Sequence, residues 1–210
     1  LYYVEPHFRY DRPQKWRYRQ FHQIWAEVIW EIDPIIDAQM IYIGYTTLNK
    51  IGLAWSFKVK INSIWTIKDR QKYIEELVSF YSNKKHLLSE EAIAKIETNP
   101  LRLLDTKLED EIILASQAPK ITQFFKKDSK EHYAKVKEYL DLFGVPYEED
   151  HCLVRWLDYY CHTVWEFVDN SWRSQDAFGW GWRYDALSTK IWAPKEIPAV
   201  WFAVWMERLV

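Results

Sequence analysis

The chain is poor in glycine and cysteine and has no long apolar run. It contains five glycines in 210 residues, about a third of the ~7% share usual in soluble proteins, and only two cysteines. Cys152 and Cys161 form no C-x-x-C pair, which excludes a disulfide-stapled scaffold and a cysteine zinc site. Charged residues interrupt every apolar stretch well short of the ~18 residues of a membrane span, and no signal-peptide pattern opens the sequence. We therefore expect a soluble, cytoplasmic protein with no membrane partner.

An excess of charge of one sign is also missing. Lys and Arg number 28 against 30 Asp and Glu, which gives a formal net charge of −2. With this balance, the overall charge does not indicate a polyanion-binding protein. Only a local basic patch remains possible. None of the six histidines has metal-ligand spacing, so the motifs predict no metal site. A hydrophobic share of 49% suffices for one sizeable core, as one domain or one domain with an insertion.

The order of patterns predicts an α+β protein in which a helical block interrupts an antiparallel sheet. Apolar and polar residues alternate on both sides of residues 11–15, which indicates a strand hairpin within residues 1–30. Further strands are expected at 57–61 and at roughly 152–157, 162–169, 174–180 and 198–204. The predicted parts are 1–65 and 145–210 as two portions of one core, with 66–144 as a helical insertion outside the sheet.

Capping residues mark the expected helices. Asp33 and Pro34 begin an amphipathic helix that runs to about Lys50, before Gly52. Its apolar side is predicted to carry Ile36, Met40, Ile43 and Leu48. The remaining expected helices run from Asp69 to Phe80, from a cap at Ser89, from Lys130 to Leu142 after the caps Asp128 and Ser129, and shortly from Arg183.

The hairpin gathers arginines, lysines and hydrogen-bonding side chains between residues 8 and 23. Arg9 and Asp11 would share one face of a strand, so that a single ligand could meet both a guanidinium and a carboxylate. A nucleotide, with its phosphates and a base amino group, has that chemistry. A solvated charged hairpin explains the composition equally well.

The residue order is more specific than the composition. Residues 8–23, FRYDRPQKWRYRQFHQ, resemble motif 2 of histidyl-tRNA synthetases, and residues 153–160, LVRWLDYY, resemble the histidine-specific motif of that family. Residues 199–210, with Glu207 and Arg208, are similar to motif 3. The resemblance covers nearly the whole chain, and the helical block falls where the family has its insertion. No segment resembles motif 1 or the anticodon-binding domain, so we expect a middle fragment.

The resemblance implies a class II synthetase fold and a two-step reaction. Histidine and ATP, with substrate-associated Mg²⁺, would form histidyl-adenylate, and the histidyl group would then pass to tRNA(His). The full-length protein would be a homodimer, and the insertion, which carries many lysines, would lean toward the tRNA acceptor arm. A solvated helical face explains those lysines equally well. The family offers one alternative on the same fold, the regulatory subunit of ATP phosphoribosyltransferase, which senses histidine without charging tRNA.

The family's roles carry over to matching positions. Arg9 and Arg155 would hold the α-phosphate and the histidine carboxylate, and Arg208 the terminal phosphates, which makes these three the expected catalytic residues. Asp11 and Phe21 would contact adenine. Gln23 would bind the amino group of histidine, and the residues expected at its imidazole are Glu27, Tyr159 and Tyr160. In isolation, paired tyrosines are more often core aromatics than ligands.

Thirteen tryptophans stand beside the five glycines. The family has glycine, or glycine would suit the place, at twelve of them: Trp16, Trp25, Trp30, Trp55, Trp65, Trp156, Trp172, Trp180, Trp182, Trp192, Trp201 and Trp205. Only Trp165 lies where an aromatic belongs. Reading the twelve as glycine gives 17 glycines and one tryptophan, which restores ordinary usage.

Our hypothesis is that UGA codons which the source bacterium reads as glycine have been translated as tryptophan; deliberate design is the alternative. As written, the chain would be a protein with a blocked site, because buried indoles would overfill the ligand space. Five tryptophans are predicted to converge near Arg9, Arg155 and Arg208, partly at glycine-favouring backbone conformations: Trp156, Trp180, Trp182, Trp201 and Trp205.

Overall fold

A computed structural model describes residues 1–13, 15, 17–54, 56–64, 66, 70–155, 159–170 and 177–209. Its centre is a seven-stranded sheet in the order β1-β2-β7-β6-β5-β3-β4. The strands are β1 (Tyr2–Phe8), β2 (Gln20–Ile29), β3 (Phe57–Ser63), β4 (Glu148–Glu149), β5 (Cys161–Asp169), β6 (Ala177–Arg183) and β7 (Ala199–Trp205). The α-helices are α1 (Pro34–Leu48), α2 (Arg70–Ser82), α3 (Glu90–Thr98), α4 (Glu109–Ser116), α5 (Lys127–Leu142) and α6 (Leu187–Ile191).

This architecture confirms the predicted α+β class. Strands β1 and β2 form the expected antiparallel hairpin, with Tyr2 opposite Ala26 and Phe8 opposite Gln20. Strands β7, β6, β5 and β3 continue the antiparallel order. The two-residue strand β4 pairs with β3 in parallel, so the sheet is mixed at that edge.

Helix α1 begins and ends as expected, but its buried face is rotated from the predicted one. The Asp33 side chain accepts a hydrogen bond from the Ile35 backbone N–H, and Gly52 ends the following π-helical turn at φ +94°. Ile43 is 46% exposed, contrary to the prediction. The helix approaches the sheet most closely at Gly44, where a Cβ would collide with the ring of Phe167. This approach turns Ile43 outward.

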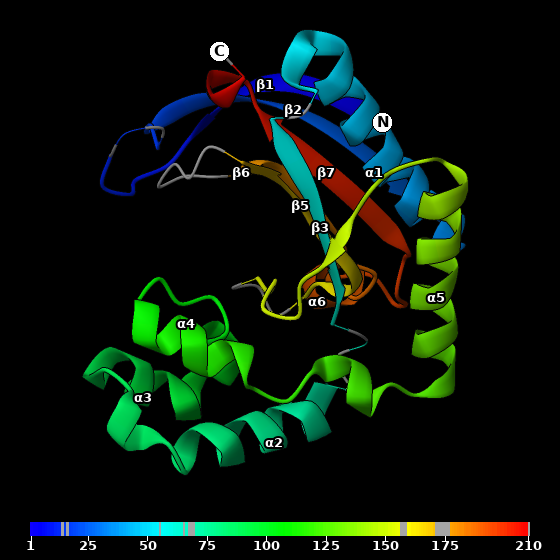
Figure 1. Cartoon of the computed structure of the whole chain (residues 1–210). Coiled ribbons are helices and arrows are strands. Elements are labelled where there is room, and N and C mark those ends of the chain that lie inside the picture. The colour runs from blue at the N-terminus through cyan, green and yellow to red at the C-terminus, as the bar shows by residue number, and fades with distance from the viewer. Residues whose placement is uncertain are drawn as a thin grey trace.

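The helical block does not pack as one unit. Helices α2 and α3 follow the expected bounds, with Ser89 as N-cap of α3, although Asp69 lies outside the described residues. Helix α5 begins three residues before the predicted Lys130, and its N-cap is the extended Lys126 rather than Asp128 or Ser129. Figure 1 shows α1 and α5 along the upper right side of the sheet, whereas α2, α3 and α4 lie below it at the lower left.

Two differences concern the second half of the sheet. Residues 152–155 of the predicted strand at 152–157 form a turn and coil, because the Asn62 side-chain amide binds the carbonyls of His151 and Leu153. Arg183 is the last residue of β6, and the short helix starts later, at Leu187. The stretch 174–176, where a strand was expected, lies outside the described residues.

Each face of the sheet has its own apolar core. Helices α1 and α5 cover a cluster that includes Val59, Phe167 and Phe202. The opposite face shares a cluster with α2, α3 and α4, in which Leu77 and Leu114 join Val164 of β5. Among the described residues, no helix has the length and apolarity that a bilayer crossing requires.

A buried ion pair fastens the end of β6 to α1. The Arg183 guanidinium donates to both carboxylate oxygens of Asp37, and neither side chain is exposed. Arg183 also donates to the Glu31 carbonyl at 2.9 Å and to the Asp185 carboxylate at 3.4 Å. Burial alone would raise the pKa of Asp37, but Arg183 and His132 outweigh it and hold that pKa below its usual range.

We predict that Asp37→Asn destabilises the chain by up to about 3–5 kcal/mol, because it leaves the buried Arg183 charge with only its longer pair to Asp185, at 3.4 Å. Urea unfolding at neutral pH measures the loss. Glu138→Gln, which breaks the exposed pair with Lys135, is the control and should change the unfolding midpoint little. Equal effects of the two substitutions would contradict the anchoring role.

Candidate functional site

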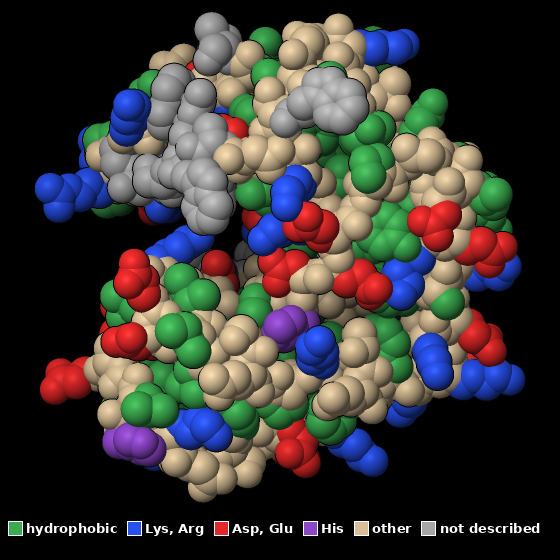
Figure 2. Space-filling model, in the orientation of Figure 1, with side chains coloured by type: hydrophobic (Ala, Val, Ile, Leu, Met, Phe, Trp, Pro, Cys, Tyr) green, Lys and Arg blue, Asp and Glu red, His purple; other side chains and the backbone are tan. Residues whose placement is uncertain are grey.

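A cavity of about 590 Å³ lies between the sheet and the insertion helices. Its sheet side is formed by β5, β6 and β7, and its opposite side by residues 104–107 and α4. Figure 2 shows the surface hollowed on the left between these parts, with basic and acidic side chains at the mouth. All three predicted catalytic arginines, Arg9, Arg155 and Arg208, line this one cavity.

Arg9 directly follows β1, and the backbone just before β2 holds it in place. Its backbone N–H donates to the Arg19 carbonyl at 2.9 Å, and its Nε donates to the Tyr18 carbonyl at 2.7 Å. The guanidinium carbon lies 4.6 Å from the ring centres of both Phe21 and Trp205. Burial and the charge of Arg17 lower the pKa of Arg9, so an anion in the cavity would relieve this crowding of cations.

An indole fills a slot between aromatic and cationic walls. The ring of Trp205 is stacked on Phe21, with 4.3 Å between ring centres, and Arg208 lies 4.6 Å from the Trp205 ring centre. An Arg208 nitrogen is fixed by donation to the Ala177 carbonyl. Indole and purine are both flat, bicyclic and aromatic. The Trp205 ring therefore occupies a place that matches a nucleotide base in shape and chemistry.

Arg155 reaches the cavity from the segment that precedes β5. Its backbone N–H donates to the Tyr160 hydroxyl at 2.8 Å, and its side chain lies 2.7 Å from Glu166. The Nη2 of Arg9 and both the Nε and the Nη2 of Arg155 are buried without an acceptor in hydrogen-bond geometry among the described residues. Buried donors of this kind are costly unless an acceptor meets them, and a phosphate or carboxylate would do so.

Charge in the cavity favours an anion. Its basic lining residues are Arg9, Arg17, Lys60, Lys107, Arg155 and Arg208, and its acidic ones are Asp105, Asp150 and Glu166. Two of these acids are already paired, Asp150 with Lys60 at 2.8 Å and Glu166 with Arg155. The surplus of cations suits a polyphosphate.

A second polar group lies farther along the same face of β2. Phe21, Gln23, Trp25 and Glu27 alternate on that face because side chains repeat every two residues in a strand. The Tyr184 hydroxyl donates to the Glu27 carboxylate. Burial and this carboxylate raise the pKa of Tyr184. Tyr184 is absent from the residues predicted from the sequence, because its contact with Glu27 joins positions 157 residues apart.

The other predicted residues are not all brought together. Gln23 is buried and accepts from the Trp25 indole N–H at 3.0 Å. Tyr160 is fully buried, with its hydroxyl engaged by Arg155, and Tyr159 is close enough to Tyr184 to raise the pKa of that phenol. Asp11 pairs with Arg17 at 2.8 Å and is not among the cavity-lining residues.

Five tryptophans share the cavity side of three adjacent strands; we call Trp25, Trp180, Trp182, Trp201 and Trp205 the tryptophan face. Cross-strand register places Trp25 and Trp180 opposite Ala203, and Trp182 opposite Trp201. Trp25 and Trp201 are stacked with ring centres 4.0 Å apart, and Trp182 meets Trp201 edge-on at 4.4 Å. Of the five residues predicted to converge, Trp180, Trp182 and Trp205 line the arginine cavity and Trp201 adjoins it, whereas Trp156 lies outside the described residues.

The predicted glycine-like backbone is found elsewhere. Trp30, in the turn after β2, has φ +76°, a left-handed conformation that L side chains rarely adopt. The four described members of the predicted group have ordinary negative φ. Trp16, Trp55, Trp65 and Trp172 lie outside the described residues.

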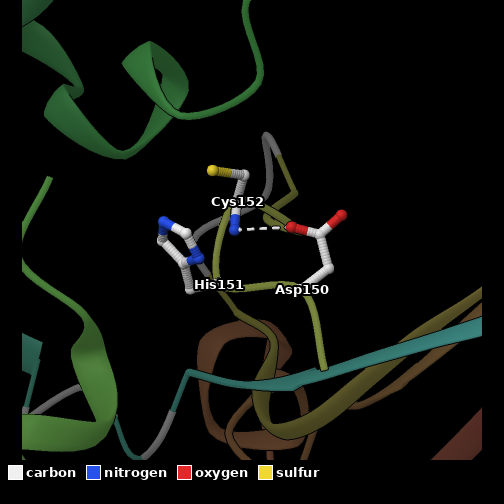
Figure 3. A group of neighbouring side chains, drawn as sticks. All are labelled: Asp150, His151 and Cys152. Atoms are coloured by element: carbon white, nitrogen blue, oxygen red, sulfur yellow. Dashed lines mark hydrogen bonds between the residues drawn. The ribbon is translucent and has the colours of Figure 1, made fainter. Parts of the chain in front are cut away.

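Three adjacent residues near the cavity could in principle bind a metal ion. Asp150, His151 and Cys152 bring one ligand atom each within 4.8 Å of the others (Figure 3). The Asp150 carboxylate accepts from the Cys152 backbone N–H at 3.0 Å and pairs with Lys60. Burial raises the pKa of the Cys152 thiol to about 11. With a protonated thiol and an engaged carboxylate, this turn is a poor metal site at neutral pH.

Comparison with known proteins places this geometry in a family. The chain is 40% identical over 209 residues to the histidine–tRNA ligase of Halothermothrix orenii, covering 100% of this chain and 49% of that protein. It superposes on the apo histidyl-tRNA synthetase of S. aureus with a TM-score of 0.74 and 34% identity, over 100% of this chain and 49% of that one. Over its whole length the chain therefore matches a segment of histidyl-tRNA synthetases. It spans about half the length of the relatives that it matches.

A further solved structure shares the fold. A structure described as an ATP phosphoribosyltransferase regulatory subunit/histidyl-tRNA synthetase from Bacillus halodurans matches with a TM-score of 0.65 at 21% identity, over 100% of this chain and 57% of that one. At this identity the likeness shows the fold alone. No family model matches the sequence.

We predict that Trp205→Gly raises the affinity of the chain for ATP by about ten- to a hundredfold. Stacking of a base on an aromatic side chain contributes about 1–3 kcal/mol, and the substitution frees the Phe21 ring for it. Calorimetric titration with ATP measures the change. The control is Trp192→Gly, because Trp192 is 83% exposed. Equal affinities of the two variants would contradict the base-slot assignment.

Proposed function

We propose that this chain is a catalytic-domain segment of a histidine–tRNA ligase, which activates histidine with ATP and transfers it to tRNA(His). The observation that carries the proposal is the cavity itself: three arginines converge on a base-sized slot against Phe21, with buried guanidinium donors that lack acceptors among the described residues. The names of the relatives supply the substrate, because they are histidine–tRNA ligases.

The proposed chemistry is adenylation followed by acyl transfer. A histidine carboxylate oxygen attacks the α-phosphorus of ATP, the bond to the β-phosphate oxygen breaks, and pyrophosphate leaves. The tRNA 3′-terminal hydroxyl then attacks the histidyl carbonyl carbon, and AMP leaves. Negative charge grows on the α-phosphate in the first step. Arg9 and Arg155 would stabilise it, while Arg208 would bind the terminal phosphates.

Binding of the two substrates would use the two ends of the β2 face. Phe21 would stack on adenine, and Asp11 would reach its amino group after release from Arg17. Gln23 would bind the histidine amino group. Glu27 would accept from one imidazole nitrogen, in a pocket completed by Tyr184, Tyr159 and Tyr160.

Mg²⁺ would enter with ATP rather than reside in the protein. Two of the three cavity carboxylates are in ion pairs with Lys60 and Arg155, so the site supplies cations more readily than metal ligands. The metal would supply charge neutralisation on the phosphates. A full-length homodimer in the cytoplasm, with α2, α3 and α4 facing the tRNA acceptor arm, completes the proposal.

We also propose that the functional polypeptide has glycine at the twelve tryptophan positions. The supporting observations are structural as well as compositional. Trp30 has a backbone conformation that favours glycine, and Trp205 fills the base slot. The indole nitrogens of Trp182 and Trp205 are buried without an acceptor among the described residues, but so is that of Trp165, so this feature does not separate the twelve positions from an ordinary tryptophan.

The coding DNA and the natural protein test this proposal directly. We expect UGA at the twelve positions and UGG at Trp165, which serves as the internal control. Peptide mass spectrometry of protein isolated from the source should find glycine at the twelve positions. UGG codons throughout, or tryptophan in the peptides, would contradict the proposal.

Histidine-dependent pyrophosphate exchange tests the activity, measured on the full-length protein with glycine at these twelve positions. We expect exchange that requires histidine, and a loss of about 10²–10³-fold in kcat for Arg9→Ala, the size that follows removal of one preorganised donor. Histidine binding without exchange would instead support the regulatory-subunit alternative. If the protein shows neither histidine binding nor exchange, its site is non-functional.

A further inference from the structure

Arg155 depends on another element for the position of its side chain. Its backbone lies in the coil before β5, where no strand or helix holds it. The backbone N–H is fixed by the Tyr160 hydroxyl, but this bond leaves the long side chain undetermined. The guanidinium lies over the Trp182 ring at 5.8 Å, a loose contact. Its close charged partner is Glu166, with 2.7 Å between Arg155 Nη2 and Glu166 Oε1.

Glu166 is well placed to orient a side chain in the cavity. It lies in the middle of β5, opposite Lys60 of β3 and Trp180 of β6, and therefore on the cavity side of a rigid sheet. The Glu166 and Arg155 side chains are 20% and 18% exposed. In such partial burial an ion pair is less screened than at the surface. Neither the Nε nor the Nη2 of Arg155 has an acceptor in hydrogen-bond geometry among the described residues, so the close contact with Glu166 is an ion pair and not a hydrogen bond.

Removal of Glu166 would leave Arg155 with a long flexible side chain and no fixed orientation. Arginine has a planar fork of donors, so its use on a phosphate depends on the direction of that plane. A misplacement of about 1 Å at a reacting centre can cost ~10²-fold in rate. Substrate binding, by contrast, draws on Arg9, Arg208 and Phe21 as well.

We propose that Glu166 is a positioning residue for adenylate formation, which acts by holding the Arg155 guanidinium against the α-phosphate position. The proposal rests on the function proposed above. It assigns Glu166 no contact with the substrates, because its carboxylate is directed to Arg155. Its effect on the reaction therefore passes entirely through Arg155.

A double-mutant cycle tests this dependence by pyrophosphate exchange in the full-length, glycine-containing enzyme. We expect Glu166→Ala to lower kcat by about 10–100-fold while the KM for ATP changes less than about threefold. Glu166→Asp should recover part of the loss. In an Arg155→Ala background, Glu166→Ala should have no further effect beyond about twofold. Glu148→Gln, which removes an exposed pair with Lys58 at the sheet edge, is the matched control and should retain full activity.

Several outcomes would overturn the proposal. An unchanged kcat for Glu166→Ala would contradict it. An equal fold loss of kcat on Glu166→Ala in the parent and in the Arg155→Ala background would also contradict it, because Glu166 would then act on its own. If Glu166→Ala fails to fold, by thermal unfolding, the isosteric Glu166→Gln takes its place in the same cycle. A parent enzyme that lacks exchange contradicts the proposed function itself, whereas an active parent with an unaffected variant contradicts only the role of Glu166.

Discussion

The two-residue repeat of side chains along β2, β7 and β6 is the constraint on which the site depends. Every second residue of these strands faces the insertion, so the size of those side chains sets the depth of the space between sheet and helices. Arg9, Arg155 and Arg208 stand around this space and cannot move far, because each is tied to backbone or to a neighbouring side chain. The side chains of β2, β7 and β6 thus set the depth of the cavity, whereas the three arginines around it keep their positions.

The opposite face shows how the same fold uses small residues. A Cβ at Gly181 would collide with Trp165, and one at Gly44 would collide with Phe167. Glycine there lets large apolar side chains and helix α1 approach the sheet closely. On the cavity face, adjacent strands carry the indoles of the tryptophan face instead. The two faces therefore differ in where the bulky rings lie: glycine opposes them on the helix-covered face, whereas on the tryptophan face they stack on one another.

The sequence predicted the elements whose signals are local. The hairpin, the Asp33-capped helix and the Ser89 cap depend on neighbouring residues, and the structure has all three. The exposure of Ile43 depends on contact between Gly44 and Phe167, and the loss of a strand at 152–155 depends on the Asn62 amide. Neither contact leaves a local signal. The grouping of the arginines could be expected only through the resemblance to a family, whereas the link between Glu166 and Arg155 requires coordinates.

The placement of Trp165 has a spectroscopic consequence. Its ring is fully buried on the helix-covered face beneath Gly181, on the side of the sheet away from the cavity. If the twelve other positions hold glycine, this segment has a single indole fluorophore in a dry, rigid setting. Its emission would then follow unfolding of the α1–α5 core and stay nearly silent when nucleotide or histidine binds. In the chain as written, the tryptophan face would dominate the fluorescence emission, and that emission would change when a ligand binds in the cavity.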